Sequence, residues 1–253
     1  MSKVETAKCW DNFWDGSSIY GLSRYSIYLY ESYLRAFRLW MPHFRNKRIL
    51  EVGVGGGYLL MRITKLGAET YGVDVSKSAI LKTKRIFSLN DVEGNIELQD
   101  ATCLGLKKNY FDLVYSLGLI EHFKEYDEME RIIREMSRVA KPEGIVVASV
   151  PKRMSIYTPK KGFHMLTRTW PFGFERTFNK IGFLSLISKY LENLEIVGVD
   201  TYPSFLNLIP NFGLKKFLDS KVLVPFCRIH ESSHPIFSSK IAHMLCAKGT
   251  PKK

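Results

Sequence analysis

The fold of this 253-residue chain is decided by the stretch Arg48–Ser76, which reads RILEVGVGGGYLLMRITKLGAETYGVDVS. It opens with a short apolar run that ends in glycines, as is typical of a buried parallel strand. Apolar residues then recur at helical spacing as far as Gly67, a residue type that commonly ends helices. Tyr71–Val75 reads as a second strand. The stretch therefore predicts strand, glycine loop, helix and strand, the opening of an α/β fold.

The glycine loop and its acidic neighbours indicate the class of ligand. A dinucleotide fingerprint is G-x-G-x-x-G, whereas residues 53–57 read GVGGG and the third fingerprint position would be Tyr58. The Lys-Ser/Thr of a phosphate-binding P-loop is missing as well. Asp74 ends the second strand, where a carboxylate can accept hydrogen bonds from both hydroxyls of a ribose. Glu51 would repel a phosphate but would suit a cationic amino acid group. These features predict S-adenosylmethionine (SAM), a nucleoside with a cationic end and no phosphate.

With these residues the chain resembles the class I SAM-dependent methyltransferases. Four further segments match in order, namely GVDVS at 72–76, LQDAT at 98–102, FDLVYS at 111–116 and KPEG at 141–144. The resemblance covers about residues 48–150. It implies an enzyme with a doubly wound, Rossmann-like α/β fold, in which seven mostly parallel strands carry helices on both faces and the last strand is antiparallel.

The resemblance also implies the organisation of the chain and its cofactor site. We expect a single methyltransferase domain with an N-terminal aromatic helical cap at 1–47, a SAM-binding core at 48–150 and a C-terminal substrate-side half at 151–253. Insertions are expected at about 151–175 and 203–240. In the resembled family, Asp74 would bind ribose and Asp100 would face the adenine. The expected cofactor-binding residues are Glu51, Gly53, Gly55, Gly57, Asp74, Val75, Asp100, Ala101, Ser116 and Leu117.

The loop after the strand Tyr110–Leu117 bears on the acceptor of the methyl group. It contains neither the proline pair nor the Pro-Cys of nucleobase methyltransferases, so methylation of a base is disfavoured. Glu121-His122 resembles the Glu-His of many quinone, sugar and lipid methyltransferases. His122 is the candidate general base, because the pKa of an imidazole lies near neutrality; it can equally hydrogen-bond the loop or contact cofactor. The metal pattern Glu-x-x-Glu-His has Gly118 at its first position, so no metal is predicted.

The N-terminal segment is rich in aromatic residues. Trp10–Trp14 reads WDNFW and is similar to segments that many small-molecule methyltransferases fold over the cofactor. A helix is predicted over Ser26–Trp40. Tyr20 and Tyr25 are candidates for lining the active site, although most aromatics here would simply pack on the core.

Charge is unevenly distributed along the chain. The net charge is +12, and residues from 151 onward hold 16 Lys and Arg against 6 Asp and Glu. This excess predicts a small-molecule or lipid-type acceptor that is anionic, or an anionic surface, while a merely basic surface is an equal alternative. Two other hypotheses remain, an RNA methyltransferase that uses the basic half and a non-catalytic binding module with this fold.

The remaining features argue against several classes of protein. Four cysteines without a C-x-x-C pair, a polar N-terminus and the absence of an apolar run of about 20 residues predict a cytoplasmic protein without stable membrane insertion. His230–His234 matches H-E-x-x-H, but Pro235 follows and no helical pattern surrounds it, so a zinc protease is disfavoured. The oligomeric state is not predicted.

Overall fold

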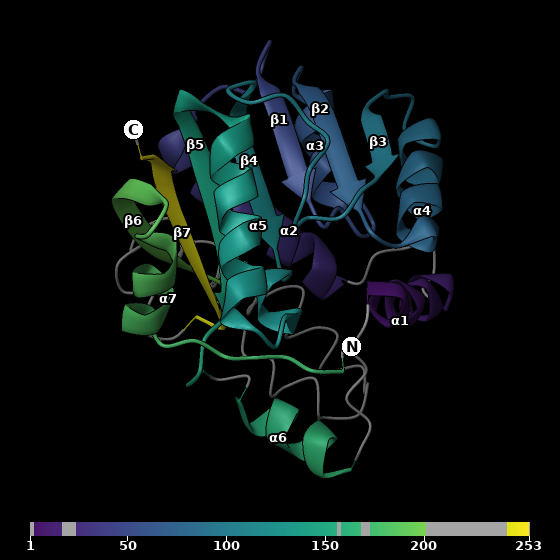
Figure 1. Ribbon diagram of the computed structural model, residues 1–253. Coiled ribbons are helices and arrows are strands. Elements are labelled where there is room, and N and C mark those ends of the chain that lie inside the picture. The colour runs from purple at the N-terminus through teal and green to yellow at the C-terminus, as the bar shows by residue number, and fades with distance from the viewer. Residues whose placement is uncertain (1–2, 17–23, 156–157, 168–172, 201–241, 253) are drawn as a thin grey trace.

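The computed structural model describes residues 3–16, 24–155, 158–167, 173–200 and 242–252. One seven-stranded sheet organises them, with helices packed on it (Figure 1). The strands are β1 (Arg48–Val52), β2 (Glu69–Asp74), β3 (Asn95–Leu98), β4 (Phe111–Leu117), β5 (Ala140–Pro151), β6 (Leu191–Val199) and β7 (Met244–Pro251). The helices are α1 (Lys3–Asp15), α2 (Arg24–Trp40), α3 (Tyr58–Lys65), α4 (Lys77–Ser88), α5 (Tyr126–Val139), α6 (Thr158–Leu166), α7 (Lys180–Ile187) and the 3-10 helix η1 (Ile120–His122).

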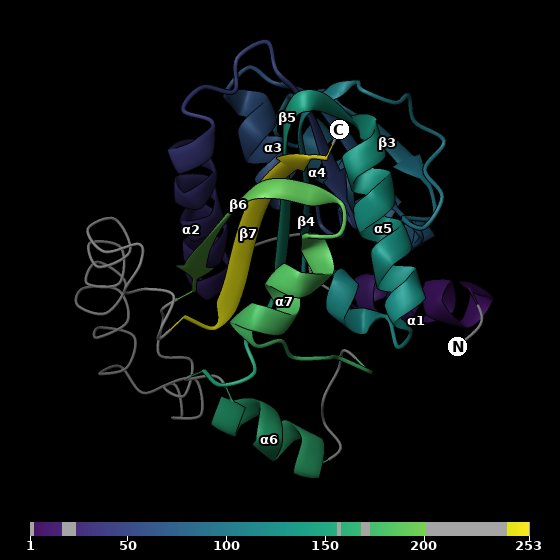
Figure 2. The ribbon, with the colours of Figure 1, turned by 60° about the vertical axis from the view of Figure 1, so that its left-hand side comes forward.

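The strand order places the ligand-binding end of the sheet. The order is β3-β2-β1-β4-β5-β7-β6, and all pairs from β3 to β5 are parallel. β7 runs antiparallel to both β5 and β6. The winding changes direction between β1 and β4, and sheets of this kind bind ligands outside the carboxyl ends of the strands at that point. Figures 1 and 2 show α1 and α6 on this side of the sheet. The predicted fold class is therefore confirmed, including the antiparallel last strand.

Two layers of helices bury the two faces of the sheet. On one face, α5 and α7 cover Leu50, Val114 and Val146, which are almost fully buried. On the other, α2, α3 and α4 cover Ile49 and Leu113. Successive strand residues point to opposite faces, which is why both the odd and the even positions of β1 and β4 are apolar. The sheet is buried on both sides, so its carboxyl end is the part left for function.

Several element boundaries differ from the sequence prediction. The residue pattern predicts a basic loop over Pro151–Gly173 and a helix over Glu175–Tyr190, whereas the structure has α6 in the first segment and α7 in the second. The pattern predicts the last strand at Ile241–Ala247, whereas β7 continues to Pro251. A Cβ on Gly249 would lie 2.7 Å from Leu194, so the missing side chain lets β6 pack closely there and the ladder continues.

No helix in the described part of the chain is both long enough and apolar enough to cross a membrane.

Candidate active site

The glycine loop after β1 is fastened to the end of β2. Asp74 Oδ2 accepts a hydrogen bond from Gly55 N at 2.9 Å, and its Oδ1 accepts one from Ser76 N at 2.9 Å. Burial raises the pKa of Asp74, and these hydrogen bonds act in the opposite direction. On the other side, Thr83 Oγ1 of α4 donates to Gly55 O at 2.8 Å. The loop is thus held in one conformation, and Val75 directly follows the carboxylate that holds it.

Three loop glycines have the backbone conformation that favours glycine. Gly53, Gly55 and Gly57 have φ values of 75°, 50° and 63°. A Cβ on Gly57 would lie 2.3 Å from Cγ2 of Thr83, so this glycine is also needed for close packing on α4. Gly55 and Gly57 are buried, whereas Gly53 and Gly56 are partly exposed at the end of β1.

Glu51 lies within β1 and is almost fully buried. Tyr115 donates its hydroxyl hydrogen bond to Glu51 Oε2 at 2.9 Å. Burial raises the pKa of Glu51 to about 8, and the bond from Tyr115 only partly offsets this. Burial raises the pKa of Tyr30, and the ionised form of Glu51 adds to this. The Glu51 carboxyl group is therefore largely protonated at neutral pH. It lies on the face of β1 that α2 covers.

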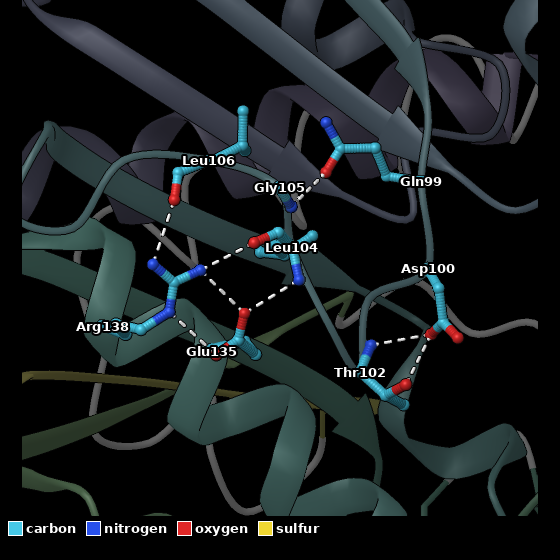
Figure 3. Close-up of polar contacts among 8 residues, drawn as sticks. All are labelled: Gln99, Asp100, Thr102, Leu104, Gly105, Leu106, Glu135 and Arg138. Atoms are coloured by element: carbon cyan, nitrogen blue, oxygen red, sulfur yellow. Dashed lines mark hydrogen bonds and ion pairs between the residues drawn. The ribbon is translucent and has the colours of Figure 1, made fainter.

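The loop after β3 is braced from α5. Arg138 donates to the carbonyl oxygens of Leu104 and Leu106, and Glu135 Oε2 accepts from Leu104 N at 2.8 Å (Figure 3). At its start, Asp100 Oδ1 accepts from both N and Oγ1 of Thr102, at 2.8 and 2.7 Å. Asp100 and the adjacent Ala101 are thus positioned by their own turn.

Helix α1 lies against the glycine loop, a contact that the sequence did not specify. The Trp14 ring packs on Gly55, with ring carbons 2.5 and 2.9 Å from where a Cβ on Gly55 would lie. Asp11 Oδ1 accepts hydrogen bonds from Ser76 Oγ at 2.6 Å and from Ser78 N at 3.1 Å, and these bonds lower its pKa. The available signal was the spacing of Trp10 and Trp14, which puts both rings on one side of a helix.

The same helix reaches His122 on the other side of the site. The Trp10 and His122 rings meet edge to face, with centroids 4.8 Å apart. His122 Nδ1 lies 2.9 Å from the carbonyl oxygen of Phe174, and because a carbonyl can only accept, Nδ1 carries the proton. Burial lowers the pKa of His122, which favours the neutral ring. Nε2 is then the nitrogen with a lone pair, as a general base requires.

The end of β4 carries two buried polar atoms without partners. Ser116 Oγ and Glu121 Oε2 have no hydrogen-bond partner among the described residues. Leu117 is half-buried at the end of the strand. Next to Glu121, Lys161 of α6 forms a 2.6 Å ion pair with Glu175 whose side chains are 12% and 9% exposed. Neither this pair nor the Tyr33 hydroxyl, which lies 2.8 Å from Ser149 Oγ, is predicted from the sequence.

Some predicted residues cannot be placed. Tyr20 and the segment His230–His234 lie outside the described residues, and Tyr25 is placed only through the backbone of α2. In the part of the chain that is described, no group of three or more His, Cys, Asp or Glu side chains could hold a metal ion.

Comparison with known proteins assigns the family. Residues 50–148 match the family model described as a methyltransferase domain. Residues 50–148 therefore form a SAM-dependent methyltransferase domain. Its cofactor is SAM, and the donor set fits this ligand, because the Asp74 carboxylate lies at the end of β2 beside a loop of glycines. In the structure the Trp14 ring packs on Gly55 of this loop.

Two curated relatives and one solved structure are representative of the matches to this methyltransferase chain. The ubiquinone biosynthesis O-methyltransferase of Bartonella tribocorum is 25% identical over 199 residues, which cover 79% of this chain and 68% of the relative. That of Pelagibacter ubique is 28% identical over 133 residues, covering 51% of this chain and 54% of the relative. A crystal structure from Pyrococcus horikoshii covers 95% of this chain and 99% of its own with a TM-score of 0.64 and 16% identity, a likeness of fold. The matches thus span about half to two thirds of the curated relatives.

Proposed function

We propose that the protein transfers the methyl group of SAM to a hydroxyl or amino group of a small-molecule acceptor. The observation that carries the proposal is the glycine loop held by Asp74, with a neutral His122 across the site and α1 in contact with both. SAM supplies an electrophilic methyl group on a sulfonium. Because charge disperses as the methyl group moves, the chain has mainly to position the reactants and exclude water.

The cofactor residues take the roles expected from the sequence. Asp74, next to Val75, binds the ribose hydroxyls, and Asp100 with Ala101 meets the adenine. The backbone at Gly53, Gly55, Gly57, Ser116 and Leu117 surrounds the methionine part, whose cationic amino group favours the ionised form of Glu51. The raised pKa of Glu51 supports this, since a cation nearby stabilises a carboxylate that burial disfavours.

His122 is proposed as the general base. Its Nε2 takes the proton of the acceptor while Phe174 O holds Nδ1–H and so fixes the ring. Helix α1 acts as the cover of the site, with Trp14 on the glycine loop and Trp10 on His122. Tyr20 and Tyr25 remain candidates for lining the acceptor site.

The relatives named for ubiquinone biosynthesis support a small-molecule acceptor. The basic C-terminal half supports an anionic or lipid-type portion of that acceptor, remote from the reacting atom. RNA is the weaker alternative, because two of the described cations there are engaged within the chain. Lys161 is paired with Glu175, and Arg176 lies over the ring of Tyr126 at 4.7 Å.

The proposal extends to the whole chain as one methyltransferase domain in the cytoplasm. Residues 1–47 serve as the cap, 48–150 as the cofactor core and 151–253 as the acceptor side. The three cysteines in the described ranges are all free thiols, in keeping with a reducing compartment.

The test combines binding and turnover. Calorimetry should show that the wild-type protein binds S-adenosylhomocysteine (SAH), and a failure to bind would remove the enzyme proposal. His122→Gln should keep the SAH affinity and lower methyl transfer by about 10²- to 10⁴-fold, the usual contribution of a general base. His43→Gln is the matched control, because His43 is exposed. Unchanged turnover in His122→Gln would remove this residue as the base.

A further inference from the structure

Glu121 presents a buried carboxyl oxygen that nothing in the described part of the chain satisfies. The residue is 2% exposed, and its backbone carbonyl accepts a hydrogen bond from Arg176 N at 2.8 Å. Its Oε2 has no hydrogen-bond partner there. A buried polar atom without a partner costs about 1–3 kcal/mol, and more if it is charged. The site therefore calls for a donor that comes from outside these residues.

The charges around Glu121 do not balance. The described charged groups that act on it are Lys161 and Glu175, which pair with each other at 2.6 Å. The Tyr33 hydroxyl, within electrostatic reach, is kept neutral because burial raises its pKa. His122 is neutral as well, as its lowered pKa indicates. Two carboxyl groups thus share one cation. Burial raises the pKa of Glu121 to about 8, so a proton fills the missing positive charge at neutral pH.

Glu121 lies beside the residue proposed as the general base. It follows β4 on η1, and its Oε1 lies 3.4 Å from where a Cβ on Gly118 would stand. The next residue is His122, the proposed base. A group that reaches His122 therefore comes to the same short helix that carries the unsatisfied oxygen.

We propose that Glu121 binds a protonated amine of the methyl acceptor, so that the acceptor is an amine rather than a carboxylate or an uncharged alcohol. The ammonium group donates to Oε2 and supplies the missing positive charge. This inference rests on the proposed function and names the substrate class of the same site.

The reaction then balances as follows. The ammonium loses one proton to Nε2 of His122, and the nitrogen lone pair forms the new N–C bond. The C–S bond of SAM breaks, its electron pair stays on sulfur, and SAH leaves. The product is again a cation, so Glu121 pairs with a positive charge in the bound substrate and again in the bound product.

Three probes that share one ring test the substrate class. Benzylamine, benzyl alcohol and benzoate are titrated by calorimetry into the SAH complex at pH 7. Benzylamine should bind at least tenfold more tightly than the other two. Glu121→Gln, which keeps the shape and removes the charge, should weaken benzylamine binding at least tenfold. Glu125→Gln is the control, because Glu125 is exposed beside the same helix. Unchanged SAH affinity in both variants shows that the fold and cofactor site are intact.

Proton release separates direct binding from a structural role. At pH 7 the free carboxyl holds a proton, and pairing with an ammonium should expel about one proton per bound amine. Titration in buffers of different ionisation enthalpy measures this release, which should decrease as the pH passes 8. The inference is overturned if benzoate binds best, if no probe binds the SAH complex, if Glu121→Gln binds benzylamine as the wild type does, or if no proton is released. Lack of SAH binding would instead overturn the proposed function.

Discussion

Replacement of Gly57 by alanine tests how strictly the packing of α4 determines the glycine loop. The residue has φ of 63°, a conformation that costs an L-residue about 1–2 kcal/mol. The new Cβ would lie 2.3 Å from Thr83 Cγ2 and 2.7 Å from its Oγ1. Carbon atoms pack at about 3.5–4.0 Å, so Thr83 must move, and overpacking of this kind costs about 1–3 kcal/mol. Movement of Thr83 also removes its hydrogen bond to Gly55 O, worth about 1 kcal/mol.

The expected loss of unfolding free energy for Gly57→Ala is about 4 kcal/mol, and at about 2–4 °C per kcal/mol its Tm should fall by about 10 °C. Two other glycines separate the causes. Gly173 has φ of 61° and no described atom within 4 Å of its would-be Cβ, so Gly173→Ala should cost only the conformational 1–2 kcal/mol. Gly162 lies in α6 with neither constraint, so Gly162→Ala should be neutral or stabilising by up to about 1 kcal/mol.

Urea denaturation and thermal melts measure the three variants, and SAH calorimetry shows whether the loop still binds cofactor. Gly57→Ala should also bind SAH more weakly, because Thr83 and Gly55 move together. A Gly57→Ala protein that melts within 2 °C of Gly173→Ala would refute the packing argument and leave only the backbone conformation.

Two further variants test the cover of the site and its buried acid. Asp11→Ala removes the acceptor of two hydrogen bonds to the start of α4, so SAH should bind about tenfold more weakly, a change of 1.4 kcal/mol; Asp15→Ala, exposed on the same helix, is the control, and equal affinities would show that α1 does not hold cofactor. For Glu51, the folded state keeps a proton between pH 4.5 and about 8 that the unfolded state has lost, so wild-type stability should fall as pH rises through this window and level off above it. Glu121, whose pKa is also raised to about 8, contributes to the same fall, so Glu51→Gln should reduce the fall by about half in urea midpoints at pH 5, 7 and 9. Exposed Glu143→Gln should follow the wild type. An unchanged slope in Glu51→Gln would show that this carboxyl is not buried with a proton.

The part of the fold that the sequence predicts is the part with a local pattern. Gly53–Gly57, Asp74 and the apolar runs of β1, β2 and β4 are each patterns of neighbouring residues, so periodicity and turn chemistry describe them well. Helix α6 was missed because Phe163 and Leu166 are 55% and 85% exposed and leave no buried apolar stripe to detect.

The contacts that build the site are mostly tertiary and could not be predicted in the same way. Asp11 meets Ser76 across 65 residues, and Tyr115 meets Glu51 across 64. In both pairs, the type of one residue does not indicate which distant residue it will contact. The lack of a partner for the Glu121 oxygen likewise depends on how the folded chain buries it. The sequence shows only a glutamate before a histidine.

Helix α1 affects how the two ligands bind and leave. Trp14 covers the loop proposed for the donor, and Trp10 of the same rigid helix leans on the residue proposed for the acceptor side. Because α1 is one rigid helix in contact with both sides, it cannot uncover the donor side while it still covers the acceptor side. The two ligands would therefore not exchange independently. A compound that spans both halves would be trapped beneath the closed helix, and a rising cofactor concentration would relieve its inhibition because both need the donor half.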